Sequence, residues 1–70
     1  MGIYRPKRFI IYTYQVLDGY TATISCAPQS RWELIKRTDT RVKLANKNVA
    51  IELSLEDFEE KWKEVEQWQI

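Results

Sequence analysis

The sequence predicts an α+β protein, in which a five-stranded antiparallel meander is covered on one face by a single C-terminal helix. Two β-branched and aromatic runs flank Asp18-Gly19, which is the strongest short hairpin signal. Three further short runs follow, and apolar residues then recur at spacings of three and four. A sheet this small could instead curl into an SH3-like or OB-like barrel plugged by the helix. The expected strands span about residues 8–17, 20–26, 31–37, 41–45 and 49–53, and the expected helix about 55–68.

The length and composition indicate one small folded domain, spanning residues 1–70. A chain of 70 residues hides only ~60% of its unfolded surface, so each large side chain matters. Three Trp, four Tyr and two Phe supply large buried areas for a core of this size. No apolar run approaches the ~20 residues of a membrane span, and the N-terminus lacks the apolar region of a signal peptide. We therefore expect a cytoplasmic protein without a membrane partner.

The first hairpin sets the two faces of the expected sheet. With a two-residue turn, Ile11 lies opposite Cys26, and both side chains face the core. Tyr12 and Tyr14 then lie on the other face, because neighbouring residues of a strand point to opposite sides. In this interpretation Cys26 is a small buried residue of the core and has no disulfide partner.

The next three strands are placed by their alternation and by the turns between them. Residues 31–37 alternate, with Trp32 and Leu34 on one side. A three-residue turn at 38–40 places Leu34 beside Leu44. A second turn at Lys47-Asn48 places Leu44 beside Ile51 and Lys43 opposite Glu52, an opposite-charge pair that supports the register.

The helix has clear start signals. Ser54 fits an N-cap, and Asp57 three residues later completes the [ST]-x-x-[DE] pattern of a capping box. Asp57 and Lys61 form a favourable i,i+4 pair. The apolar stripe expected to lie on the sheet consists of Leu55, Phe58, Trp62, Val65 and Trp68.

The residues that are missing exclude several kinds of chemistry. There is no histidine, which removes the usual general base and the commonest zinc ligand. The only glycines, Gly2 and Gly19, are too far apart for a phosphate-binding loop, and no calcium-loop spacing is present. Nothing near Cys26 in sequence would activate it as a nucleophile. We therefore expect no enzymatic activity, no cofactor and no metal.

Charge is divided unevenly along the chain. Residues 1–54 hold nine basic and four acidic residues, for a net charge of +5, whereas residues 55–70 hold two and six, for −4. The division could stabilise the contact between helix and sheet, although exposed pairs contribute only ~0–1 kcal/mol each. It could instead serve a partner, because the uncovered sheet face would combine aromatic, hydroxyl and cationic side chains.

The candidate binding residues lie on that uncovered face. Interfaces are enriched in Tyr and Arg, but the tyrosines could equally be ordinary strand residues, or core residues of a barrel. The sequence favours a non-enzymatic interaction or regulatory protein that binds a protein partner, with self-association possible. The alternative is a nucleic-acid-binding domain, which the net charge of +1 and the absence of a recognition motif make less favoured. The candidate residues are Tyr12, Tyr14, Arg31, Ile35, Arg37, Arg41 and Lys43.

Overall fold

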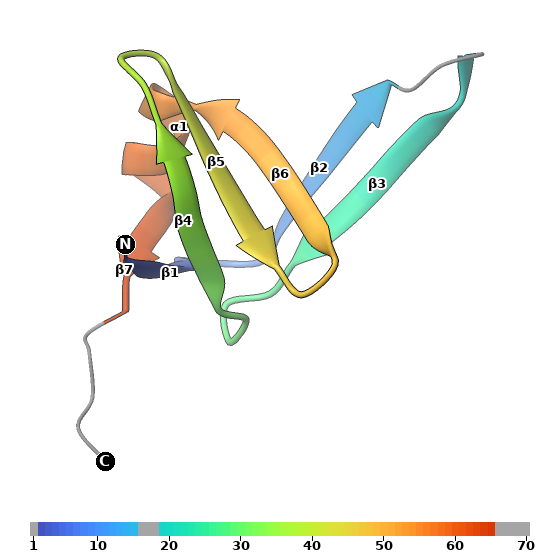
Figure 1. Cartoon of the computed structure of the whole chain (residues 1–70). Coiled ribbons are helices and arrows are strands. Elements are labelled where there is room, and N and C mark those ends of the chain that lie inside the picture. The colour runs from blue at the N-terminus through green and yellow to red at the C-terminus, as the bar shows by residue number, and fades with distance from the viewer. Residues whose placement is uncertain (1, 16–18, 66–70) are drawn as a thin grey trace.

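The computed structural model describes residues 2–15 and 19–65 and has one short helix among antiparallel strands (Figure 1). The α+β class is as expected from the sequence, and the sheet is not closed into a barrel. No helix of the described residues is long and apolar enough to cross a membrane. The elements are β1 (Ile3–Pro6), β2 (Ile10–Gln15), β3 (Thr21–Cys26), β4 (Trp32–Arg37), β5 (Arg41–Asn46), β6 (Val49–Ser54), α1 (Leu55–Lys61) and β7 (Trp62–Glu64).

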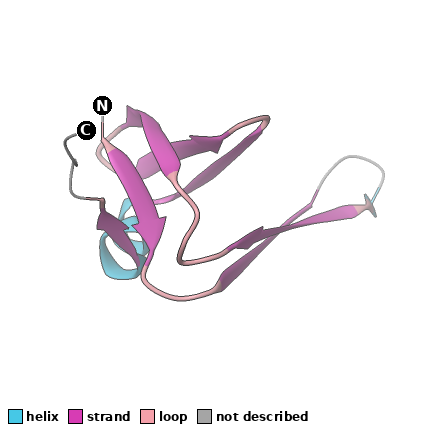
Figure 2. Cartoon of the chain, turned by 90° about the horizontal axis from the view of Figure 1, so that it is seen from below, coloured by secondary structure: helices cyan, strands magenta, loops and turns pink. Residues whose placement is uncertain are grey.

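The strands form two separate sheets. One is five-stranded, in the order β6-β5-β4-β1-β7, and we call this sheet together with α1 the body. The other contains only β2 and β3, and we call it the ribbon. Figures 1 and 2 show the ribbon projecting from the body as a long arm. The expected single meander is therefore present only in β4, β5 and β6, whereas β1 and β7 complete the larger sheet.

The register of β5 with β6 is the expected one, whereas that of β4 with β5 is as expected only up to Leu34: a β-bulge between Leu34 and Lys36 shifts the pairing, so Arg37 lies opposite Val42 and not opposite Arg41. Leu34 pairs with Leu44, Leu44 with Ile51, and Lys43 with Glu52. Lys47 has a left-handed φ of 55° in the turn between β5 and β6, where such backbone is common. Alternation along these strands directs Val42, Leu44, Ile51 and Leu53 into the core.

The expected register of the first hairpin is wrong by one residue. Ile10, not Ile11, pairs with Cys26, and Tyr12 pairs with Ile24. The expectation assumed a two-residue turn, but Gln15 pairs with Thr21, which leaves five residues between the strands. Residues 16–18, which include most of the expected turn, lie outside the described part. A shift of one residue turns the side chains of one strand to the other face; here β3 keeps Cys26 in the core and β2 is turned, so Tyr12 and Tyr14 face the core side.

The helix begins where expected but ends earlier. The Ser54 hydroxyl accepts a hydrogen bond from the backbone N–H of Asp57 at 3.1 Å, which confirms the N-cap. Trp62 is already extended, with φ −117° and ψ 154°, and starts β7. The expected continuation through Val65 is wrong because Trp62–Glu64 pairs with β1; residues 66–68 lie outside the described part. A helix of seven residues has little stability of its own, so tertiary pairing decides where it ends.

The core lies between the larger sheet and α1. Phe58 and Trp62 are each 4% exposed, and both pack with the apolar side chains of β5 and β6, as expected. The rings of Trp32 and Trp62 meet edge to face, with centroids 5.9 Å apart. Cys26 at the base of the ribbon is fully buried in the same cluster, which confirms its expected place in the core.

Candidate binding surface

The two tyrosines of β2 join the ribbon to the body. The Tyr12 hydroxyl donates a hydrogen bond to Oδ2 of Asp57 at 2.7 Å and accepts one from Nε1 of Trp62 at 3.0 Å. The rings of Tyr12 and Tyr14 are stacked, with centroids 6.3 Å apart. Burial raises the pKa of the Tyr12 hydroxyl, and its hydrogen bond to Asp57 acts in the same direction. Tyr12 therefore remains a neutral hydrogen-bonding group at any physiological pH.

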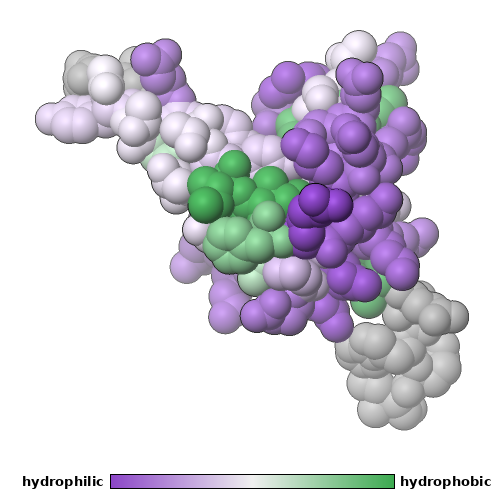
Figure 3. Space-filling model, turned by 180° about the vertical axis from the view of Figure 1, so that it is seen from behind, coloured by the Kyte–Doolittle hydropathy of each residue, from purple (hydrophilic) through white to green (hydrophobic). Residues whose placement is uncertain are grey.

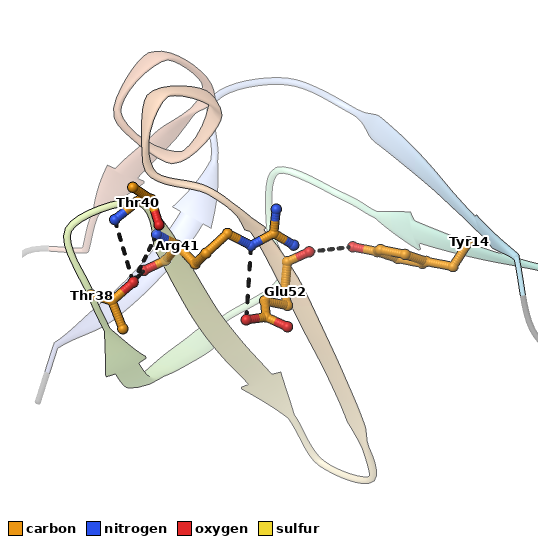
Figure 4. A network of polar contacts seen from close by, with 5 residues as sticks. All are labelled: Tyr14, Thr38, Thr40, Arg41 and Glu52. Carbon is orange, nitrogen blue, oxygen red and sulfur yellow. Dashed lines mark hydrogen bonds and ion pairs between the residues drawn. The ribbon is translucent and has the colours of Figure 1, made fainter.

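Tyr14 reaches an edge strand of the larger sheet. Its hydroxyl donates a hydrogen bond to the backbone carbonyl of Glu52 on β6 at 3.1 Å (Figure 4). The side chain of Glu52 lies 3.8 Å from Nε of Arg41, which belongs to the neighbouring strand β5. Burial also raises the pKa of the Tyr14 hydroxyl. This contact joins the C-terminal part of β2 to β6, so Tyr14 has a structural role in the fold.

The sequence-predicted site residues do not form one surface. Tyr12 and Tyr14 are half-buried between ribbon and body. Arg37 lies at the helix side, where its guanidinium is 3.4 Å from Glu59 and 6.0 Å from the centre of the Phe58 ring. Arg41 on β5 is joined to Tyr14 only through Glu52 (Figure 4). The remaining residues do not join them: Arg31 precedes β4, Ile35 lies at a β-bulge of β4 and is 38% exposed, and Lys43 lies on the outer face of β5.

The outer face of the larger sheet is rich in cations. Lys36 lies directly opposite Lys43, and Arg5 lies opposite Lys63, so like charges are cross-strand neighbours twice. Such pairs are mildly destabilising. The acidic residues on this outer face are Glu33 of β4 and Glu52 of β6. Because the tyrosines face the other way, these like-charged pairs lie apart from the aromatic rings that a nucleic-acid site would combine with them, and among the outer-face cations Arg41 reaches Tyr14 only through Glu52.

A second surface lies where the ribbon leaves the body, and we call it the junction surface. It is a depression of about 420 Å³, with Phe9 and Ile11 as its most exposed apolar side chains, at 55% and 57%. Figure 3 shows an apolar area bordered by hydrophilic side chains at this junction. The lining residues are Lys7, Arg8, Phe9, Ile10, Ile11, Glu60 and Lys61.

The electrostatics of the junction surface favour an anionic partner. Three of its charged residues are basic and one is acidic. Lys61 is already paired with Asp57 at 3.0 Å, as expected for this i,i+4 pair, whereas Lys7 and Arg8 are exposed. Sequence reasoning missed this surface because the expected register directed Ile11 into the core. With the observed register, the sequence does indicate this surface, because two basic residues stand directly before exposed apolar residues in the run Lys7-Arg8-Phe9-Ile10-Ile11.

The chemistry available in the described residues is limited. No group of three or more His, Cys, Asp or Glu side chains that could hold a metal ion was found among residues 2–15 and 19–65. Burial raises the pKa of the Cys26 thiol from 9.0 to about 11, so at neutral pH it is a protonated, weakly nucleophilic thiol. Comparison of the chain with protein-family models, curated proteins and solved structures found no match.

Proposed function

We propose that this chain is a small non-enzymatic interaction protein, and that it binds a protein partner through the junction surface. The observation that carries the proposal is the pair of exposed apolar side chains, Phe9 and Ile11, beside a depression rimmed by Lys7 and Arg8. A concave apolar site with a few charged groups at its rim is the usual form of a recognition site. Interaction or regulation of a cytoplasmic partner is the role that this surface supports best.

The chemistry of the rim defines the partner that would fit. An extended protein segment with one large apolar side chain and flanking Asp or Glu residues would fill the depression and pair with Lys7 and Arg8. Truncating an apolar anchor that becomes buried in an interface typically costs ~1–2 kcal/mol or more. The exposed cations would mainly increase the association rate and would make binding sensitive to salt.

Matched variants test the proposal. The wild-type protein, immobilised and mixed with extract of its source cell after nuclease treatment, should retain a protein partner. A double variant, Phe9→Ser with Ile11→Ser, should lose that partner at equal folded concentration, because both side chains are exposed and add little to the core. Val49→Ser, which removes another exposed apolar side chain far from the junction in sequence, is the control and should keep it. Retention of the partner by the double variant would contradict the proposal.

The second candidate function is nucleic-acid binding through the outer face of the larger sheet. Its supporting observation is two pairs of like-charged neighbours, Lys36 opposite Lys43 and Arg5 opposite Lys63. Titration with labelled oligonucleotides at low salt tests it. Affinity tighter than about 10⁻⁶ M that falls with added salt, and that Lys36→Ala with Lys43→Ala weakens, would favour this function over protein binding.

A further inference from the structure

The two strands of the ribbon differ from the other strands of the described residues in having no charged side chain. From Phe9 to Ser30 the only charged residue is Asp18, and the six residues of β2 and the six of β3 include none. The strands β1, β4, β5, β6 and β7 each carry at least one Lys, Arg, Asp or Glu. Charged side chains and proline on edge strands are the usual devices that prevent edge-to-edge pairing, and the ribbon strands have neither.

The outer edge of β3 is available for such pairing. In the described residues β3 pairs only with β2. Figure 1 shows β3 on the far side of β2 from β6, and the contact from Tyr14 to Glu52 ties β2 to the body. Because alternate N–H and C=O groups of a strand point to each side, the outer edge of β3 presents donors and acceptors without a strand partner in the described part.

We propose that this edge binds the same edge of a second copy, so that two β3 strands pair antiparallel about a two-fold axis at Thr23. Only a register in which Thr21 opposes Ser25 uses the whole exposed span of β3 and leaves the buried Cys26 outside. Ala22 then opposes Ile24, and Thr23 opposes its own copy. In this register the side chains that face solvent in one chain meet those that face solvent in the other.

The composition of β3 favours a second copy as the occupant. An isologous contact brings identical residues together, so any charge at the centre would meet its own like. The centre of β3 has none, and paired Thr and Ser residues are favourable cross-strand neighbours. Pairing would also convert an isolated two-stranded ribbon, which has little stability of its own, into a four-stranded sheet.

This inference is independent of the proposed function. The junction surface uses residues 7–11 with Glu60 and Lys61, whereas the dimer uses Thr21–Ser25. Ile11 is the cross-strand neighbour of Ser25, but Phe9 lies outside β2 and Thr23 lies outside the junction surface, so variants of Phe9 and of Thr23 test the two proposals separately and either can fail alone.

The first test is the oligomeric state of the whole chain, measured by sedimentation over a wide range of concentrations. The wild-type mass should rise from one chain to two and stop there. Thr23→Lys should raise the dissociation constant by ~10-fold or more, since two like charges would lie directly opposite. Thr13→Lys is the matched control, because Thr13 is the neighbour of Thr23 on β2 and shares its exposed face, but lies one strand away from the dimer axis.

Two further tests distinguish this contact from other causes of dimerisation. An equimolar mixture of Thr23→Lys and Thr23→Glu proteins should recover the dimer through opposite charges. Thr23→Cys should form a disulfide-linked dimer on mild oxidation and Thr13→Cys should not, because directly opposed strand residues have Cα atoms ~4.5–5.5 Å apart. A wild-type protein that is monomeric throughout, assemblies larger than two chains, or equal effects of the Thr13 and Thr23 variants would each overturn the proposal.

Discussion

The body and the ribbon differ in how their side chains are buried and held in place. The body buries seven apolar side chains in one cluster, which Cys26 of the ribbon completes, and keeps its charges on exposed or half-buried positions. The ribbon has alternating half-buried and exposed residues, and only Cys26 at its base is fully buried. Its attachment combines apolar contacts of Ile10, Ile24 and Cys26 with two tyrosine hydroxyls that reach Asp57, Trp62 and Glu52. An arm that lacks enough apolar area to form its own core is therefore held by packing at its base and by polar side-chain contacts.

The uneven distribution of charge along the chain contributes little to the stability of the fold. In the described residues one ion pair, Arg37 with Glu59 at 3.4 Å, joins the basic sheet to the acidic helix. Both side chains are about half exposed, so the pair contributes only ~0–1 kcal/mol. The separation of charge is thus a minor stabiliser, and the contacts of Tyr12 and Tyr14 matter more for how the parts are joined.

The largest expected effect comes from the core of the body. Trp62→Ala should lower the free energy of unfolding by ~3–5 kcal/mol, because it removes a buried ring and the N–H that the Tyr12 hydroxyl accepts. Denaturant titration followed by circular dichroism measures it. The control is Phe9→Ala, which truncates an exposed ring and should change stability by less than ~0.5 kcal/mol. Equal effects of the two variants would show that Trp62 is not a core residue.

The next effect tests the attachment of the ribbon. Tyr12→Phe should cost ~1–3 kcal/mol, because the N–H of the buried Trp62 loses its acceptor and Asp57 loses a donor. Tyr14→Phe, which removes an exposed hydrogen bond to Glu52, is the matched control and should cost less. Denaturant midpoints of the two variants decide the order. If Tyr14→Phe is the more damaging change, the Tyr12 contacts do not carry the attachment.

A smaller effect is expected at the helix start. Ser54→Ala should cost ~1 kcal/mol, because the backbone N–H of Asp57 loses its acceptor. Ser25→Ala, at an exposed position of the ribbon, should be nearly neutral. Thermal melting of both proteins compares them directly, and a neutral Ser54→Ala would mean that the cap adds nothing to the body.

The smallest effect near neutrality is one of pH. The pKa of Cys26 rises from 9.0 to about 11 on folding, and that of Tyr12 is raised as well, so the folded state favours both protonated forms. The contribution of Cys26 is fully present below pH 9 and is lost as pH rises from 9 to about 11, and that of Tyr12 is lost only above its ordinary pKa of 10.0. Stability should therefore be flat from pH 7 to below 9 and then decline. A decline that begins well below pH 9 would contradict the burial of the thiol.

The sequence predicted the parts of the fold that depend on local signals. The turns on either side of β5 fixed the pairing of Leu34, Leu44 and Ile51, and Ser54 marked the start of the helix. The end of the helix was missed because Trp62–Glu64 pairs with Ile3–Pro6, at the other end of the chain, and no local pattern reports such a contact. The position of the ribbon was missed for the same reason.

The candidate site was less predictable than the fold. The expected faces of the first hairpin depended on the length of one turn. Because that length was wrong, Tyr12 was expected on the exposed face, whereas in the structure Ile11 is there. Arg41 and Lys43 were placed correctly on the outer face, since the register of β5 was right. The assumption that these cations share a face with the tyrosines was wrong.

The measurement that tests the account most directly is native-state hydrogen exchange of the wild-type protein and Tyr14→Phe. If the tyrosines join a weakly stable ribbon to a more stable body, the backbone N–H groups of β2 and β3 open with a lower free energy than those of β5. Tyr14→Phe should lower the ribbon value further and leave that of β5 unchanged. A single shared opening free energy for ribbon and β5 in both proteins would contradict this account.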